Sequence, residues 1–237
     1  MIRIAAVGDV HFGEDSGGTL RPHLERLPER ADVLLIAGDL TRIGTIAEAR
    51  VLVEELDGVG VPTIAVLGNH DHHSDQAPQI RALLEDAGIR VLEQEATTVP
   101  VNGACLAVVG AKGFGGGFSG SSGTAFGEPE MKQFIRATEA AAAGLESALR
   151  DCAADARVVL LHYSPVKETL HGEAPEIYPF LGSFLLARAV DTAGADLVIH
   201  GHAHGGAEKG VTPGGVRVRN VAEPVIRESY RVYVLDR

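Results

Sequence analysis

The stretch IRIAAVGDVH, residues 2–11, indicates how this chain folds. Its first six residues are almost all apolar, as expected of a strand covered on both faces, and a glycine with two polar side chains follows at once. The same order recurs in five later runs: Val33–Ala37, Thr63–Leu67, Ala104–Val109, Val158–Leu161 and Leu197–Ile199. We therefore predict that residues 2–7 and these runs form strands.

Helical patterns separate the predicted strands. In Thr45–Leu56 the apolar residues recur on one helical face. Further helices are predicted from a cap at Ser74 or Asp75 to Asp86, over Glu130–Ala154 and over Phe180–Ala193. The alternation predicts an α/β fold with mostly parallel central strands. Two late strands with no helix between them make the sheet mixed: Val216–Val221 and Tyr230–Leu235.

The composition is that of an ordinary globular protein. Hydrophobic residues make up 45% of the 237 residues and charged residues 22%, which supports a sizeable core. No internal repeat divides the sequence, and we predict a single domain over residues 1–237. Cys105 and Cys152 have no CxxC neighbour, so we predict buried or half-buried free thiols.

The formal net charge is −11. This charge argues against a groove for long nucleic acid, because a negative protein repels the phosphate backbone. A small anionic substrate would need local positive charge, which bound metal ions can supply. The N-terminus becomes charged too soon for a signal peptide, and no apolar run reaches membrane-spanning length. The predicted location is therefore the cytoplasm, with no membrane partner.

Polar side chains that bind metals follow one apolar run after another. They are Asp9, His11, Asp39, Asn69, His162, His202 and His204. Such residues gather in one crevice at the carboxyl ends of strands in α/β sheets. Side chains two apart in extended chain share a face, so Asp9 with His11, and His202 with His204, can reach one site. The glycines before them let the backbone approach an ion or its ligands.

Seven such groups exceed what one ion needs. Two divalent ions that share a carboxylate would use them all. Mixed imidazole, carboxylate and amide ligands suit Mn, Fe, Zn or Co better than Mg or Ca. The sequence therefore predicts a cofactor of two divalent transition-metal ions.

The ordered set of motifs resembles the calcineurin-like metallophosphoesterases over most of the chain. The motifs are Asp9-x-His11, Gly38-Asp39, Gly68-Asn69-His70-Asp71, His162 and Gly201-His202-x-His204. The resemblance implies a two-layer mixed β-sandwich flanked by helices. It also implies one metal on Asp9, His11, Asp39 and His204, and another on Asp39, Asn69, His162 and His202, with Asp39 bridging.

The resemblance implies hydrolysis of phosphate esters. A hydroxide bridging the two metals would attack phosphorus in line with the leaving oxygen. His70, next to Asn69, is expected to project over the site without being a ligand. It would protonate the leaving oxygen or stabilise the transition state as imidazolium. Asn69 and His70 are expected to contact the substrate, and Asp71 either orients His70 or caps a local turn.

The substrate class stays open at this point. We favour small-molecule phosphodiesters, with phosphomonoesters or pyrophosphates as the alternative for the same site. A non-catalytic metal-binding module is disfavoured because every motif residue is present, and a nuclease is disfavoured by the charge. The sequence does not predict an oligomeric state.

Several residues near the motifs have two readings. His200 is expected to be structural or to support a metal ligand, and His23 is expected at the surface. His72 and His73 are expected to face solvent, with contact to the substrate as the alternative. A rim position that contacts the substrate is the alternative to a plain loop position for Tyr163 and His171. For Lys112, contact with a second phosphate is the alternative to a surface lysine. The segment Gly110–Gly127, rich in glycine, is expected to be a long flexible loop that borders the pocket as a lid or rim.

Overall fold

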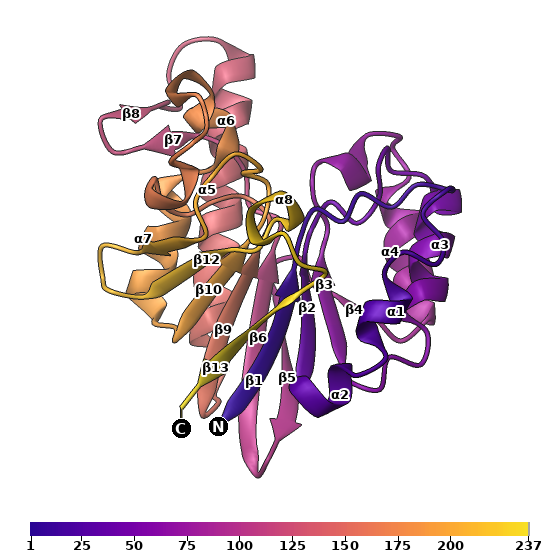
Figure 1. The fold of residues 1–237 in the computed structure, drawn as a ribbon. Helices are drawn as coiled ribbons and strands as arrows, with labels where there is room; N and C mark the ends of the chain where they lie inside the picture. The colour runs from indigo at the N-terminus through magenta and orange to yellow at the C-terminus, as the bar shows by residue number, and fades with distance from the viewer. Residues whose placement is uncertain (237) are drawn as a thin grey trace.

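The computed structural model describes residues 1–236 and contains two sheets packed face to face (Figure 1). The strand order is β13-β1-β2-β3-β4 in the first sheet and β11-β12-β10-β9-β6-β5 in the second. The predicted α/β class with a two-layer mixed β-sandwich flanked by helices is confirmed. Arg237, the last residue of the predicted domain, lies outside the described residues, and the assignment of one domain stays a prediction.

Both sheets have parallel centres, and one edge of the first sheet and both edges of the second are antiparallel. The first contains β1 (Ile2–Val7), β2 (Val33–Ala37), β3 (Thr63–Val66), β4 (Arg90–Val91) and the antiparallel β13 (Arg231–Leu235). In the second, the parallel strands are β6 (Ala104–Ala111), β9 (Ala156–Leu161), β10 (Leu197–His200) and β12 (Arg217–Asn220). Antiparallel β5 (Glu95–Val101) and β11 (Lys209–Val211) form its edges.

The second sheet is buried on both faces. Val108, Val158 and Leu160 face the core that the two sheets share. Val109 and Val159 point the other way, into a cluster with helices α5 (Pro129–Arg150) and α7 (Phe184–Ala193). Because side chains alternate across a strand, two apolar faces require the nearly continuous apolar runs of the sequence.

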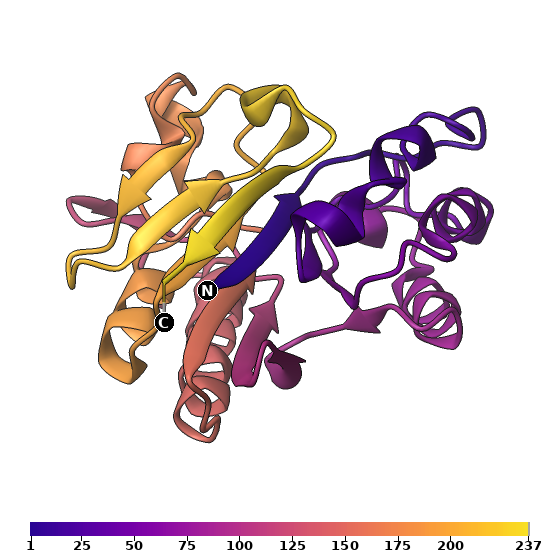
Figure 2. The ribbon, with the colours of Figure 1, turned by 60° about the horizontal axis from the view of Figure 1, so that its bottom comes forward.

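Helices of the N-terminal half flank the first sheet, so helices lie on both outer sides of the molecule (Figure 2). The longer two are α3 (Ile46–Leu56) and α4 (Ala77–Asp86), whose residues Leu52, Ile80 and Leu84 join the shared core. A capping box of Thr45 and Glu48 begins α3. Short helices complete the set: α1 (Arg21–Leu24), α2 (Leu27–Arg30), α6 (Tyr178–Leu181) and α8 (Glu223–Ile226).

Two predicted helix boundaries are wrong. Neither Ser74 nor Asp75 caps α4, which begins after Gln76. The Ser74 hydroxyl instead donates to the carbonyl of Ile43, and Asp75 has a φ of 57°. The second wrong boundary is the C-terminal end of α5, which stops at Arg150, four residues before the predicted Ala154.

The predicted helix Phe180–Ala193 is interrupted after α6. Around Gly182 the extended chain pairs with Ser164, whose N–H donates to the carbonyl of Leu181 and whose carbonyl accepts from the N–H of Ser183. A side chain at Gly182 would collide with that carbonyl of Ser164. Ser183 then caps α7 by accepting a hydrogen bond from the backbone N–H of Leu185. The break follows from a tertiary contact and has no signal in the helical periodicity.

The segment Gly110–Gly127 is more ordered than the predicted flexible loop. Gly110 and Ala111 end β6, and a hairpin of β7 (Gly117–Phe118) and β8 (Ser121–Ser122) follows. Phe118 is only 3% exposed. A side chain at Gly117 would collide with the carbonyl of Ser121. The glycines therefore permit close packing in this part of the segment.

Candidate metal centre

The candidate ligands follow the carboxyl ends of central strands from both sheets. Asp9 follows β1, Asp39 follows β2 and Asn69 follows β3, while His162 follows β9 and His202 follows β10. Because the strands of each sheet that carry these residues are parallel, their carboxyl ends share one end of the sandwich (Figure 1). The topology therefore brings together residues up to 195 positions apart in sequence.

The side chains form two groups that share one carboxylate. Potential ligand atoms of Asp9, His11, Asp39 and His204 lie within 4.8 Å of one another, and so do those of Asp39, His162 and His202. Asn69 adjoins the second group, with Oδ1 2.9 Å from His162 Nε2. The geometry thus brings together all seven predicted ligands and puts Asp39 in both groups.

Contacts within each group are short. In the first, His204 Nε2 lies 2.9 Å from Asp9 Oδ1 and 3.4 Å from His11 Nε2. In the second, His162 Nε2 lies 3.4 Å from Asp39 Oδ1. These are the separations of side chains that surround a common point.

Left-handed backbone aims four of these side chains. The φ angles are 59° at Asp9, 44° at His11, 49° at Asp39 and 70° at His202. Residues other than glycine rarely adopt this conformation, and strain of this kind gathers at functional sites. The prediction that extended backbone aligns the pairs was wrong in its reason, because the chain turns at these residues. His202 and His204 accordingly enter different groups.

Glycines next to the ligands allow the close approach that we predicted. A side chain at Gly68 would collide with the Asp39 carboxylate, and one at Gly201 would collide with Asp9. Gly38, at a φ of 81°, lies against the ring of His162. Small residues at these points let the strand ends converge.

The protonation of His162 fits a bound cation. Its Nδ1 lies 2.9 Å from the carbonyl of Ala37, which can only accept, so Nδ1 carries the proton. The lone pair of Nε2 therefore faces the oxygens of Asn69 and Asp39, three acceptors with no proton between them. A metal ion satisfies such a set, and the carbonyl fixes the tautomer that binds it.

Burial favours the uncharged imidazoles that metals require. It lowers the pKa of His162 and of His202 to about 3 and that of His11 to about 4. Burial also raises the pKa of Asp9 to about 6, while the hydrogen bond with Asp9 raises the pKa of His204. Desolvated carboxylates beside neutral imidazoles are costly without a cation, so this donor set fits divalent ions.

His70 lies at the mouth of the centre and belongs to neither group. Its Nδ1 is 2.7 Å from the carbonyl of Arg42, so Nδ1 donates there. Its Nε2 faces inward, 4.0 Å from Asp39 Oδ2, and its backbone N–H donates to Asp39 Oδ1. The imidazole is thus held beside the candidate ligands with one nitrogen directed at the centre, and its action on substrate stays a prediction.

Asp71 does not orient His70, which corrects one predicted role. Its carboxylate is fully buried and accepts hydrogen bonds from the backbone of Leu40, Thr41 and Gly68 and from the Thr41 hydroxyl. Burial raises the pKa of Asp71 to about 6, against the effect of these hydrogen bonds. Asp71 therefore ties together the loops that carry Asp39 and Asn69, and Arg42 orients His70.

Of the other residues named in the sequence analysis, some lie buried or half-buried near the candidate centre and others lie at the surface. His200 is buried, with Nδ1 against the Gly201 carbonyl and Nε2 against the Thr169 hydroxyl, so the structural reading is confirmed. The tyrosine ring of Tyr163 lies 4.4 Å from that of His202. Lys112 is half-buried beside it and is not a plain surface lysine. Among the histidines outside the candidate centre, His23, His72, His73 and His171 are exposed.

Sequence reasoning missed the backbone groups that orient the imidazoles. The carbonyls of Ala37 and Arg42 fix His162 and His70, and the carbonyl of Phe180 lies 3.3 Å from His202 Nε2. Any residue type offers a carbonyl, so no sequence motif could have marked these partners.

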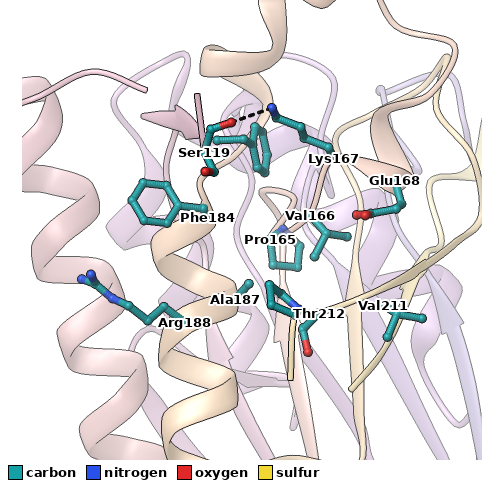
Figure 3. A pocket seen from close by; sticks show the side chains of 12 residues that line it. Ser119, Pro165, Val166, Lys167, Glu168, Phe184, Ala187, Arg188, Val211 and Thr212 are labelled. Atoms are coloured by element: carbon teal, nitrogen blue, oxygen red, sulfur yellow. Dashed lines mark hydrogen bonds between the residues drawn. The ribbon is translucent and has the colours of Figure 1, made fainter. Parts of the chain in front are cut away.

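A cavity of about 520 Å³ lies apart from the centre, between β7, α7 and the segment after His162 (Figure 3). Its walls are mainly apolar, with Pro165, Phe184 and Val211, and it includes none of the seven candidate ligands. At its edge Lys167 donates to the carbonyl of Ser119. This cavity is therefore separate from the candidate metal centre.

The comparison with protein families agrees with the geometry. The calcineurin-like phosphoesterase model matches residues 2–206, and the chain therefore belongs to the calcineurin-like phosphoesterase family. A comparison with curated protein sequences gave no match. Within residues 1–236, no helix is long and apolar enough to cross a bilayer.

Solved structures share the fold at low identity. A phosphopantetheinyl hydrolase (PptH) from Mycobacterium tuberculosis gives a TM-score of 0.71 at 15% identity, over 98% of this chain and 96% of that one. A putative 5′-nucleotidase from Staphylococcus aureus gives 0.57 at 16% identity, over 99% of this chain and 51% of that one. GAP50, the anchor in the inner membrane complex of Plasmodium, gives 0.57 at 15% identity, over 94% and 72%.

Proposed function

We propose that this protein is a phosphoesterase that uses two divalent transition-metal ions and prefers small-molecule phosphodiesters. The observation that carries the proposal is the pair of ligand groups joined at Asp39. Family membership supports hydrolysis of phosphate esters as the reaction class. The net charge of −11 supports a small substrate over long nucleic acid.

We assign the first ion to Asp9, His11, Asp39 and His204, and the second to Asp39, Asn69, His162 and His202. Mn, Fe, Zn and Co suit this mixture of imidazoles, carboxylates and an amide. When bound, two such ions supply an activated water and positive charge for the phosphoryl oxygens.

The residues of the chain position the substrate and the proton. His70 Nε2 points at the centre, while its Nδ1 is engaged by the Arg42 carbonyl. In the imidazolium form, Nε2 can donate a proton to the leaving oxygen. We assign a substrate contact to Asn69, adjacent to His70, whose amide N–H groups would donate to a phosphoryl oxygen. The buried carboxylate of Asp71 holds together the two loops that carry Asp39 and Asn69, because it accepts hydrogen bonds from the backbone N–H groups of Leu40 and Gly68.

A screen of the purified, Mn-loaded protein tests the proposal. The panel contains phosphomonoesters, phosphodiesters including cyclic nucleotides, pyrophosphates and a phosphopantetheinyl ester, the last because of the fold shared with the phosphopantetheinyl hydrolase. We expect turnover to be fastest on a phosphodiester, and to be lost after removal of the metals. Two bound ions with no hydrolysis of any ester would contradict the enzyme assignment. Faster turnover of monoesters would contradict the diester preference.

A further inference from the structure

Lys112 is anchored to the metal centre through its backbone. It directly follows β6, and its carbonyl accepts hydrogen bonds from the backbone N–H groups of His162 and Tyr163, both at 3.1 Å. Its own N–H donates to Glu93 Oε2. The root of the side chain is therefore fixed relative to a candidate ligand, His162.

The Lys112 ammonium packs on aromatic faces beside the centre. Its Nζ lies 4.9 Å from the ring centroid of Phe114 and 5.4 Å from that of Tyr163. Tyr163 in turn packs on the ring of His202. Burial lowers the pKa of Lys112, and the carboxylates of Glu93 and Asp39 oppose this shift. The ammonium thus lies within the electrostatic field of the shared carboxylate.

This ammonium has no acceptor among residues 1–236. Neither a hydrogen bond nor an ion pair joins its Nζ to a carbonyl or carboxylate there. Two other cations are engaged: Lys167 donates to the carbonyl of Ser119 (Figure 3), and Arg42 pairs with Asp15. Aromatic faces stabilise a cation but accept none of its three N–H donors. Lys112 is therefore a half-buried donor available to a ligand.

Charge balance indicates what that ligand is. Two divalent ions would more than neutralise Asp9 and Asp39, and Lys112 adds a further positive charge on the same side. The ions are sufficient for the phosphoryl group that reacts, so a separate ammonium suits a second anionic group. Lysine carries a compact point charge and commonly binds phosphate groups by donating hydrogen bonds to their oxygens.

We propose that Lys112 binds a second phosphoryl group of the substrate, next to the one held at the metal centre. The preferred phosphodiesters would then carry a second phosphoryl group close to the one that reacts. This inference rests on the proposed function and narrows its substrate class. It makes Lys112 a specificity residue that takes no part in proton transfer.

Calorimetric titration of the Mn-loaded protein with two probes tests this. Methylenediphosphonate presents two phosphoryl groups that cannot be hydrolysed apart, and orthophosphate presents one. In Lys112→Met we expect the affinity for methylenediphosphonate to fall about 10–100-fold, as for loss of a charged hydrogen bond. The affinity for orthophosphate should change less than about 3-fold, because the metals hold it. Elemental analysis after titration checks that both ions remain.

Matched variants complete the design. Lys209→Met removes an exposed lysine on β11 and should leave both affinities unchanged. Lys112→Gln keeps a donor without the charge and serves if Lys112→Met fails to fold, with the same selective loss expected. Equal losses for both probes, or no loss, would overturn the inference while leaving the phosphoesterase intact. A wild-type protein with two ions that binds neither probe and cleaves no ester would refute the proposed function, and the inference with it.

Discussion

The two sheets contribute different chemistry to one centre. The oxygen ligands Asp9, Asp39 and Asn69 all follow strands of the first sheet, whereas the second sheet contributes only the imidazoles of His162, His202 and His204. Each candidate group draws on both sheets, so neither layer alone provides a complete set of ligands. We infer that metal binding is coupled to the packing of the two sheets against each other.

The largest effect should come from the residue that both groups share. Asp39→Asn should weaken both ions by more than about 100-fold, because even supporting residues around a metal commonly contribute 10–100-fold. Activity should fall with the metal content. His11→Ala, which touches only the first group, should weaken chiefly one ion. Elemental analysis and anomalous scattering measure occupancy at each position.

The comparison of these two variants tests the binuclear assignment directly. A wild-type protein that saturates with one ion per chain, with none near Asn69 and His162, would contradict it. Equal losses of both ions in His11→Ala would instead show that the groups bind cooperatively, and would remove the distinction between shared and unshared ligands.

A substitution of His70 tests whether a loop of the first sheet also supplies the proton for the leaving oxygen. His70→Asn should cost about 10²–10⁴-fold in turnover on alkyl esters, the range for general acid catalysis. The loss should be distinctly smaller on para-nitrophenyl esters, since that leaving group departs without a proton. Metal content should stay unchanged, because His70 lies in neither ligand group. Equal losses on both kinds of ester would leave His70 as a charge stabiliser.

Removal of the metals should loosen the coupling between the sheets. Each bound ion stabilises the folded protein by about 2.7 kcal/mol when free metal is at 100 times its Kd. Chelation should therefore lower the thermal midpoint, and readdition of Mn should restore it. The matched control is Asp39→Asn, which should show little of this metal-dependent shift. An unchanged midpoint in the chelated wild type would show that the sheets pack independently of the ions.

The sequence predicted the central strands, the six members of the two groups and the adjoining Asn69, because glycine and polar residues after apolar runs mark strand ends in parallel sheets. It missed β5, an edge strand that contains several polar residues and a proline. This strand lacks the continuous apolar run that marks the central strands. It also missed the left-handed backbone at Asp9 and Asp39, because nothing in a Gly-Asp dipeptide specifies that φ. Tertiary contacts, such as that of Gly182 with Ser164, decide the rest.

Asp71 distinguishes support of the first-sheet loops from catalysis. Its carboxylate accepts four hydrogen bonds from the loops that carry Asp39 and Asn69. Asp71→Ala leaves buried donors unpaired and should lower the free energy of unfolding by about 3 kcal/mol. The conservative Asp71→Asn should be destabilised too, since its amide donors face these N–H groups. Chemical denaturation measures both. Full stability with a loss of activity alone would contradict the supporting role.

The smallest effect on stability should come from a substitution at Glu55, which lies on α3 beside the first sheet and outside the metal centre. This side chain is 6% exposed and accepts hydrogen bonds from the backbone N–H groups of Gly18, Leu20 and Arg21. Burial alone would raise its pKa, but the three hydrogen bonds outweigh burial and the pKa of Glu55 is lowered. Glu55→Gln should therefore lower the free energy of unfolding near pH 7 by about 1–2 kcal/mol.

The pH dependence of that difference has a definite sign. A carboxyl whose pKa is lowered by folding stabilises the protein above its unfolded pKa, about 4.3 for glutamate, and loses this contribution as the pH falls through the folded value. The difference between wild type and Glu55→Gln should thus be constant from about pH 6 to 7 and shrink below about pH 4. Denaturation curves at several pH values measure it, with the exposed neighbour Glu54→Gln as a control expected to change stability by less than about 0.5 kcal/mol. Because Glu55 contacts neither ligand group, metal content should stay at the wild-type level. A loss of metal in Glu55→Gln would show instead that the centre depends also on the helices that flank the first sheet, and not on its strand ends alone.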